Sequence, residues 1–313
     1  MKNQKKIDLS KIRTFSVKKR KTKVVLNDFA RVSGKKVSFR KFYASLPKFL
    51  AANSLKEVVK AIIIARKNNK PVILGMGAHV IKVGLNPLII DLMKKRIITC
   101  IALNGAGAIH DFEIATLGRT SEDVGEGLET GMFGMVKETQ TDMNEAIAEL
   151  QDSSSEPRGM GALLGKKLIQ MKAKYRQFSL LYHAFELNLP ITVHVAIGTD
   201  TIHMSPKVDA RSLGEASFND FQALAYAVSQ LEGGVYINLG SAVLLPEVFL
   251  KALTIARNLG NKVKNFTTVN MDMLQHYRPY QNVLSRPGGK AFALTGHHEI
   301  MFPLLYQALL ESL

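Results

Sequence analysis

The chain has 313 residues, of which 46% are hydrophobic and 22% charged, a composition typical of a globular protein with a large core. No apolar run approaches the roughly 20 residues that a membrane-spanning helix needs. The only cysteine, Cys100, cannot form an internal disulfide, and the basic N-terminus is not followed by the apolar stretch of a secretory signal. We therefore expect a cytoplasmic protein without a membrane segment.

The net charge of +16 is concentrated at the N-terminus. Residues 1–50 contain 16 Lys or Arg and two Asp, which gives +14, and the other 263 residues carry only +2. Such a basic run is typical of a solvated, partly disordered arm, whose attraction for polyanions is nonspecific and sensitive to salt. The nearly neutral remainder, residues 51–313, shows neither a basic face nor an aromatic stacking platform, so we expect a single α/β domain without specific nucleic-acid binding.

Beyond the arm, helical periodicity alternates with short apolar runs. Ser54 and Glu57 have the spacing of a capping box, which predicts a helix start there. Apolar runs predict strands at 71–77, 97–104, 189–198, 233–240, 265–271 and 290–296. Because such strands, separated by helices, are typical of parallel sheets covered on both faces, the pattern predicts a Rossmann-like α/β fold with six parallel strands. The glycine-rich, acidic residues 118–160 predict an excursion, a candidate lid, that ends in a flexible loop at 151–161.

Ligands of such sheets bind where the strands end, and four of the expected strands end in glycine or polar residues. These strand ends contain Gly75 and Gly77, then Asn104, Gly105 and Gly107, then Thr199 and Asp200, and last Gly240 and Ser241. At Gly105 and Gly107 the missing side chains would let backbone amides approach a pyrophosphate at the start of the next helix. A tight structural turn is the alternative interpretation of the same residues.

From about residue 51 to the C-terminus the chain resembles deoxyhypusine synthases. The clearest similarity is RPGGKAFALTGHHEIMFPLL, which begins at Arg286, and the segments IITCIALNGAGAIHD, LPITVHVAIGTD and GGVYINLGSAVLLPE follow the family's order. The resemblance implies the NAD-binding fold of that family, an NAD cofactor, and a homotetramer with its sites between subunits.

The resemblance also implies an enzyme that oxidises spermidine and carries its aminobutyl group as an imine on a lysine. In this match the lysine position is Leu245, and a leucine cannot form an imine. Ile109 and His110 stand in place of a family acidic pair, although Asp111 and Asp272 remain. Because a polyamine needs several carboxylates to offset its desolvation, spermidine is not the expected substrate.

The candidate site residues follow from their positions in the resemblance to deoxyhypusine synthases. His110 and His203 follow strand ends, and histidine can act as an acid or base near neutral pH. They and Asp272 are the candidate catalytic residues. The candidate cofactor contacts are Gly75, Gly77, Asn104, Gly105, Gly107, Asp111, Thr199, Asp200, Gly240 and Ser241. For Asp200 a helix N-cap is the alternative. No metal is predicted, because no Cys or carboxylate cluster completes a site with His297 and His298.

The leading hypothesis is an NAD-dependent enzyme of altered specificity, which performs a redox-assisted transfer or an oxidoreduction on an unidentified small molecule. The alternative is a noncatalytic dinucleotide-binding or assembly protein. Sirtuin-like deacylation is a further alternative, but the single cysteine is incompatible with the four-cysteine zinc module of that class.

Overall fold

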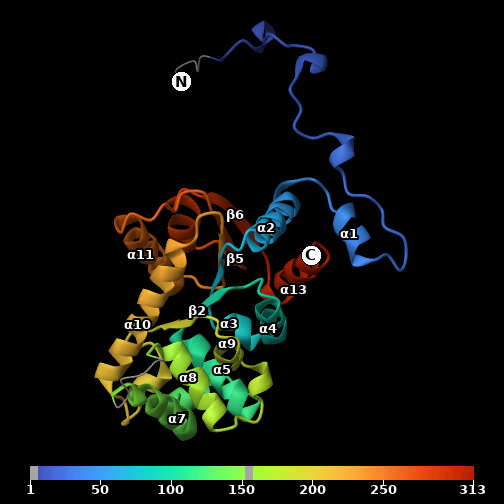
Figure 1. Cartoon of the computed structure of the whole chain (residues 1–313). Helices are drawn as coiled ribbons and strands as arrows, with labels where there is room; N and C mark the ends of the chain where they lie inside the picture. Colours follow the sequence, from blue (N-terminus) through green and yellow to red (C-terminus); the bar gives the residue numbers. More distant parts are fainter. Residues whose placement is uncertain (1–5, 152–157) are drawn as a thin grey trace. The chain divides into compact units, whose positions relative to one another are not determined.

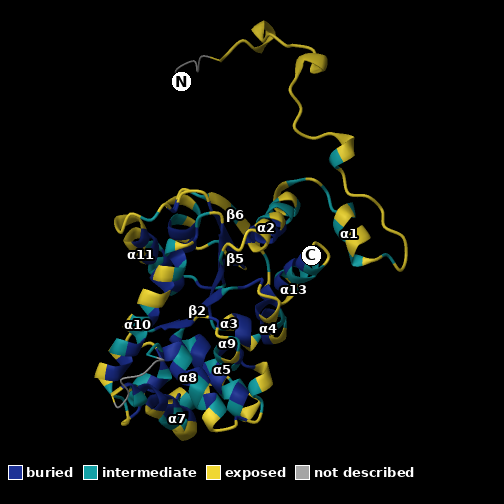
Figure 2. Ribbon diagram, viewed as in Figure 1, coloured by how far each residue is buried: buried dark blue, intermediate teal, exposed yellow. Residues whose placement is uncertain are grey.

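The computed structural model describes residues 6–151 and 158–313 (Figure 1). The chain divides into two units, Met1–Phe49 and Leu50–Leu313. The described part of the first unit holds three 3-10 turns, η1 (Leu9–Lys11), η2 (Val17–Lys19) and η3 (Leu26–Asp28), and the short helix α1 (Phe39–Ser45). None of these four elements buries a residue, and Figure 2 shows this unit as almost entirely exposed. The part of the first unit that the structure describes, residues 6–49, therefore has no core of its own.

The second unit is built on one six-stranded sheet. Its strands are β1 (Val72–Met76), β2 (Cys100–Asn104), β3 (Ile191–His194), β4 (Val235–Leu239), β5 (Thr267–Asp272) and β6 (Lys290–Thr295). Their order is β3-β2-β1-β4-β5-β6, and every neighbouring pair is parallel. The predicted six-stranded parallel sheet is confirmed. Because the chain leaves β1 in one direction and β4 in the other, the strand order reverses between these two strands, which is where such folds bind ligands.

Helices cover the sheet and form a helical group beside β2 and β3 (Figure 1). The helices are α2 (Leu50–Lys67), α3 (His79–Lys82), α4 (Asn86–Lys94), α5 (Gly105–Leu117), α6 (Val124–Thr130), α7 (Lys137–Ala148), α8 (Met160–Gln170), α9 (Leu180–Glu186), α10 (Ala210–Ser229), α11 (Leu244–Asn258), α12 (Tyr277–Pro279) and α13 (His298–Leu310), with 3-10 turns η4 (Glu149–Gln151), η5 (Arg176–Phe178) and η6 (Thr201–Met204) and a π-helix, η7 (Tyr280–Ser285). No helix among the described residues has the length and apolarity that crossing a membrane requires.

Two details of the second unit differ from the sequence-based expectation. The prediction that a helix starts with a capping box at Ser54 was wrong. Helix α2 begins four residues earlier, at Leu50, and Ser54 lies inside it. Glu57 instead forms an ion pair with Lys290 of β6. The excursion at 118–160 contains two helices, α6 and α7, and its predicted flexible loop falls partly on residues 152–157, outside the described residues.

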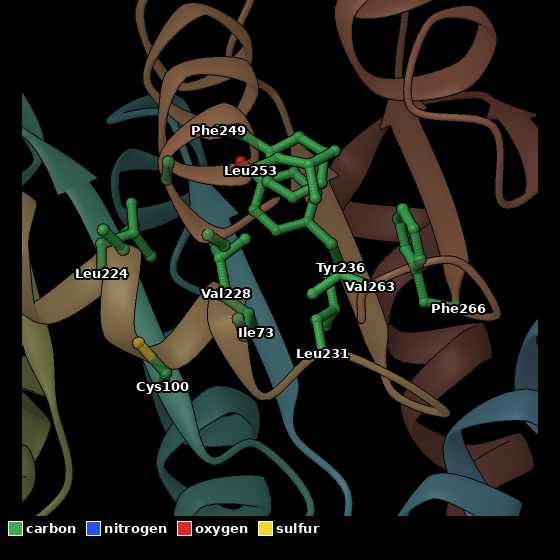
Figure 3. Packing of buried hydrophobic residues seen from close by; sticks show 14 of the residues in the cluster. Ile73, Cys100, Leu224, Val228, Leu231, Tyr236, Phe249, Leu253, Val263 and Phe266 are labelled. Atoms are coloured by element: carbon green, nitrogen blue, oxygen red, sulfur yellow. The ribbon is translucent and has the colours of Figure 1, made fainter. Parts of the chain in front are cut away.

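The core on the α10 and α11 side of the sheet centres on an aromatic stack (Figure 3). The rings of Tyr236 and Phe249 lie parallel, with centroids 3.7 Å apart. Gly75 of β1 makes room for this stack, because a β-carbon there would lie 2.5 Å from the Tyr236 hydroxyl oxygen. Leu245 is fully buried in the same cluster. Gly75 and Leu245 therefore serve the core rather than the surface of the sheet edge.

The two edges of the sheet are treated differently. At the β3 edge the Asp220 carboxylate accepts hydrogen bonds from the backbone N–H groups of Val193 (2.7 Å) and Gly161 (2.9 Å), and the Ser217 hydroxyl donates to the Val193 carbonyl. These contacts satisfy backbone groups that an edge strand would otherwise leave open. At the other edge most of β6 is exposed, with only Leu294 buried. One edge of the sheet is therefore closed and the other is open.

Asp220 makes a testable contribution to the pH dependence of stability. Burial raises its pKa to about 7, against the opposing effect of the three backbone N–H groups that it accepts. The native state thus holds a proton that the unfolded chain releases above its normal pKa, and native stability falls as pH rises from about 4 to 7. We expect Asp220→Asn to gain stability relative to the wild type over this range, by on the order of 1–4 kcal/mol. Thermal unfolding of both proteins at pH 4.5 and pH 8 measures this difference; a difference that does not change with pH would contradict it.

Candidate functional site

The turns that follow β1 and β4 meet at the carboxyl edge of the sheet. The Gly77 N–H donates to the Leu239 carbonyl at 3.0 Å, and a β-carbon on Gly77 would lie 2.2 Å from the Gly240 carbonyl oxygen. Gly240 has a φ of +66°, which favours glycine. These two glycines therefore bring the two turns into backbone contact at the point where the strand order reverses.

Asp200 lies over the start of α5. A β-carbon on Gly105 would come within 2.0 Å of an Asp200 carboxylate oxygen, so the glycine makes room for the carboxylate. Burial raises the pKa of Asp200. The Oδ2 atom of Asp200 is buried and has no hydrogen-bond partner among the described residues. A buried acceptor without a partner is costly, which indicates a donor from a ligand or water.

Two hydrogen bonds fix the orientation of His203. Its Nδ1 atom accepts the backbone N–H groups of Gly198 (3.1 Å) and Asp200 (3.4 Å). The neutral ring therefore carries its proton on Nε2, which lies 3.9 Å from Asp200 Oδ2. His203 caps η6 and orients Asp200, and its Nε2 is not a free base. The geometry supports a positioning function for His203 rather than the catalytic one expected from the sequence.

The N-terminus of α5 does not offer the free amides that the glycines suggested. The Gly107 N–H donates to the Asn104 side chain at 2.9 Å, and the Asp200 carboxylate lies against Gly105 at the start of α5. A pyrophosphate would have to displace an anionic side chain there. By contrast, the N–H groups of Ser241 and Ala242, which precede α11, donate to no acceptor among the described residues. The start of α11 is the better anion site of the two.

The predicted lid instead supports the Asp200 loop. The Gln140 side-chain amide donates to the Thr201 carbonyl at 3.1 Å, and Asn144 donates to the Ile202 carbonyl at 3.1 Å. Both side chains lie on α7 and are buried. Gly134, with a φ of +72°, packs directly against Thr201. The excursion therefore holds the loop after β3 in place, a function that its composition did not suggest.

A histidine that the sequence did not single out as a candidate completes the edge on the other side. His298, the first residue of α13, has Nε2 3.7 Å from Asp272 Oδ1 at the end of β5. Its ring packs against Gly240 and lies 5.9 Å from the ring of His79, measured between centroids. Its Nδ1 is buried without a partner. Burial lowers the pKa of His298, and the Asp272 charge opposes that effect. His298 is recognised as a site residue by its contact with Gly240, which can be seen only in the folded structure.

Of the remaining predicted residues, Asp111 and Gly75 lie in the interior, and Thr199 lies at this edge. Asp111 is completely buried and accepts four hydrogen bonds, from Asn86, Ser179, Leu180 and Leu181. With both oxygens engaged, it anchors α9 and has no capacity left for a cofactor. Gly75 lies beneath the aromatic stack, and Thr199 is exposed next to Asp200.

The position of Leu245 changes the argument about the missing lysine. Its side chain is fully buried in the apolar core, and an unpaired lysine ammonium there would bear a large desolvation cost. Leu245 is the second residue of α11, and its N–H donates to the Ser241 hydroxyl oxygen at 3.2 Å, so its backbone lies at the carboxyl edge while its side chain is buried in the core. A leucine in this place cannot form an imine. The expectation against spermidine rests also on the carboxylates at this edge, Asp200 and Asp272.

Cavities also lie elsewhere in the second unit. One of about 410 Å³ adjoins the amino ends of β4, β5 and β6, and one of about 520 Å³ lies beside β3. We favour the carboxyl edge, because the unpartnered buried acceptors and histidines gather there. In the described ranges, 6–151 and 158–313, no three His, Cys, Asp or Glu side chains come together in a way that could hold a metal ion.

The arrangement is similar to that of solved structures, although no family model and no curated protein matches the sequence. A conserved candidate LOR/SDH protein from Methanococcus maripaludis S2 matches at a TM-score of 0.53 and 17% identity, over 90% of this chain and 74% of that one. AgrE, in a ternary complex with ornithine and NAD+, gives 0.54 and 14% over 82% of this chain. A candidate deoxyhypusine synthase from Entamoeba histolytica gives 0.51 and 10%, over 88% of this chain and 93% of that one.

The chain shares their fold. Identities of 10–17% establish nothing finer than the fold. The match spans only 33% of the length of AgrE, so that protein as a whole is not a guide to this one. The predicted deoxyhypusine-synthase-like architecture is confirmed at this level.

Proposed function

We propose that the second unit binds a nicotinamide dinucleotide at the carboxyl edge of its sheet and is an NAD-dependent enzyme acting on a small molecule. The observation that carries the proposal is the buried, unpartnered Oδ2 atom of Asp200, at the edge where the fold binds ligands. A ribose hydroxyl is a donor of suitable chemistry for this acceptor. AgrE, which shares the fold, has been solved with NAD+.

The residues present fit such a cofactor in two places. Asp200 would accept from ribose hydroxyls, and the free N–H groups of Ser241 and Ala242 at the start of α11 would receive the pyrophosphate. Gly77 and Gly240 hold the turn after β1 against the turn that leads into α11. When bound, the dinucleotide supplies a hydride acceptor or donor. The chain's own groups must then supply orientation and a site for the substrate proton.

A thermal-shift titration with NAD+, NADH and NADP+, and with spermidine in parallel, tests this proposal. A ligand that binds only the native state raises its apparent stability. We expect a concentration-dependent rise with a nicotinamide dinucleotide and none with spermidine. Absence of a shift with every dinucleotide would remove the basis of the proposal. Binding without turnover of any substrate would favour a noncatalytic dinucleotide-binding protein.

Substitution of Asp200 sharpens the test. Asp200→Asn replaces the charged acceptor, and a hydrogen bond to a charged group contributes about 1.5–3 kcal/mol. We expect dinucleotide affinity to fall about 10–100-fold. The matched control is Asp123→Asn at the exposed start of α6, where asparagine caps equally well. Equal loss of affinity in both variants would show that the effect is not local to the site.

The partners of the chain belong to the same proposal. We propose a cytoplasmic homo-oligomer, with a tetramer as the expected state and no specific nucleic-acid partner. Exposed apolar side chains flank the ends of β4, β5 and β6 and support contact with a further copy: Val243, Leu274, Tyr277, Tyr280 and Ile300. Multi-angle light scattering across a range of protein concentrations measures the assembly, and a monomer at every concentration would contradict this part.

A further inference from the structure

His110 belongs to a hydrogen-bonded cluster on the surface of α5. Its Nδ1 atom lies 2.6 Å from the Thr120 hydroxyl, which donates to Glu113 Oε2 at 2.5 Å. The other oxygen of Glu113 accepts the hydroxyl of Thr139, a buried residue of α7, at 3.1 Å. Two threonines from separate segments therefore hold the Glu113 carboxylate, and one of them connects it to the imidazole.

The direction of these hydrogen bonds determines where His110 carries its proton. An ionised carboxylate can only accept, so Thr120 must give its single hydroxyl hydrogen to Glu113. The Thr120 oxygen can then only accept from His110, which places the ring proton on Nδ1. The Nε2 atom of His110 has no hydrogen-bond partner among the described residues and is not buried. It is left as an unprotonated nitrogen that solvent can reach.

We propose that Glu113 and Thr120 hold His110 in the Nδ1-protonated form, with Nε2 as the proton acceptor of the site. That this proton comes from the small-molecule substrate rests on the function proposed above. A nicotinamide dinucleotide, when bound, would accept the hydride of a substrate C–H bond, and the O–H or N–H proton would leave as the C=O or C=N bond forms. His110 Nε2 would take that proton, so that atoms and charge balance.

The surroundings of His110 favour the neutral ring that a proton acceptor requires. Burial lowers the pKa of His110, and the nearby ammonium of Lys82 on α3 lowers it further, while the Glu113 charge raises it. The helices α3 and α5 are in contact, and α5 starts beside Asp200. His110 lies five residues from Gly105, about 8 Å along the helix. The base is thus on the element that also supports the Asp200 carboxylate.

Nitrogen NMR of the imidazole side chains in the full chain tests the proposal without cofactor or substrate. We expect His110 at pH 8 to show the Nδ1-protonated pattern, with a pKa below that of a free histidine. Thr120→Val removes the acceptor and should shift the ring to the Nε2-protonated form that free histidine prefers. Thr120→Ser keeps the hydroxyl and should preserve the wild-type pattern. The exposed His297 is the internal reference and should not change.

Each outcome decides one hypothesis. An Nε2-protonated His110 in the wild type, or an unchanged tautomer in Thr120→Val, would contradict the proposal that Glu113 and Thr120 hold His110 in the Nδ1-protonated form. If Thr120→Val does not fold, the wild-type and Thr120→Ser spectra still decide, because only the proposed geometry gives the Nδ1 form in both. Absence of dinucleotide binding in the thermal-shift titration would not affect the tautomer found by NMR. Conversely, an Nε2-protonated His110 would not affect the evidence for dinucleotide binding.

Discussion

Replacing Asp111 by alanine is expected to lower the free energy of unfolding by roughly 3–5 kcal/mol. The carboxylate accepts from the Asn86 side chain at 2.9 Å and from the Leu180 N–H at 2.8 Å with one oxygen. Its other oxygen accepts from the Ser179 hydroxyl and the Leu181 N–H. Alanine would leave four donors without an acceptor in the interior. Chemical denaturation measured by circular dichroism gives the loss directly.

The control for this prediction is Asp123→Ala, which removes an exposed helix cap and should cost about 1 kcal/mol. Similar costs for the two variants would show that the buried network does not contribute as its contacts indicate. The pH dependence of the free energy of unfolding gives a second test. Burial raises the pKa of Asp111 to about 6 from 3.8, so its contribution to stability is greatest at low pH and falls between these two values. The stability cost of Asp111→Ala should vary over the same interval.

The second large effect is expected at the turn between β1 and α3. Gly77→Ala would place a β-carbon 2.2 Å from the Gly240 carbonyl oxygen and 3.0 Å from its carbon. Because both are backbone atoms, which cannot rotate away as a flexible side chain can, the two strand ends must separate. We expect a loss of about 2–3 kcal/mol of stability and the loss of dinucleotide binding. Denaturation and the thermal-shift titration measure the two effects on one preparation.

The matched control is Gly214→Ala in α10. A β-carbon at Gly214 meets no atom within 4 Å, and alanine favours the helix by roughly 0.5–1 kcal/mol. This variant should be as stable as the wild type or slightly more stable, with unchanged binding. If Gly77→Ala binds dinucleotide as well as Gly214→Ala does, the contact between the two turns is not part of the cofactor site.

The sheet was predictable because its strands are short, apolar and separated by helices, so that each strand could be found independently. β1 and β4 are buried along their whole length, as the continuous apolar runs suggest. Helix starts were less predictable. Ser54 and Glu57 have the spacing of a cap, but apolar packing extends α2 back to Leu50. Local sequence signals fixed which elements form, and packing fixed where they begin.

The site was harder to predict, because the sequence places residues at strand ends without giving the direction of their side chains. Asp111 and Asp200 have the same residue type and both follow a strand, yet one is enclosed by four donors and the other keeps a free buried oxygen. Glu113 and Thr120 gave no signal, since their importance depends on the turn after α5. Similarly, Leu245 could be assigned to the core only once its burial was known.

The unequal edges of the sheet limit how this chain can associate through its strands. Asp220 and Ser217 consume the hydrogen-bonding capacity at β3, while the outer side of β6 stays exposed. Pairing of two β6 strands about a two-fold axis would use the open edge of each copy and leave only closed edges outward. Growth by strand addition would therefore stop at two copies. Such a pairing would leave no open strand edge on which a fibre could extend.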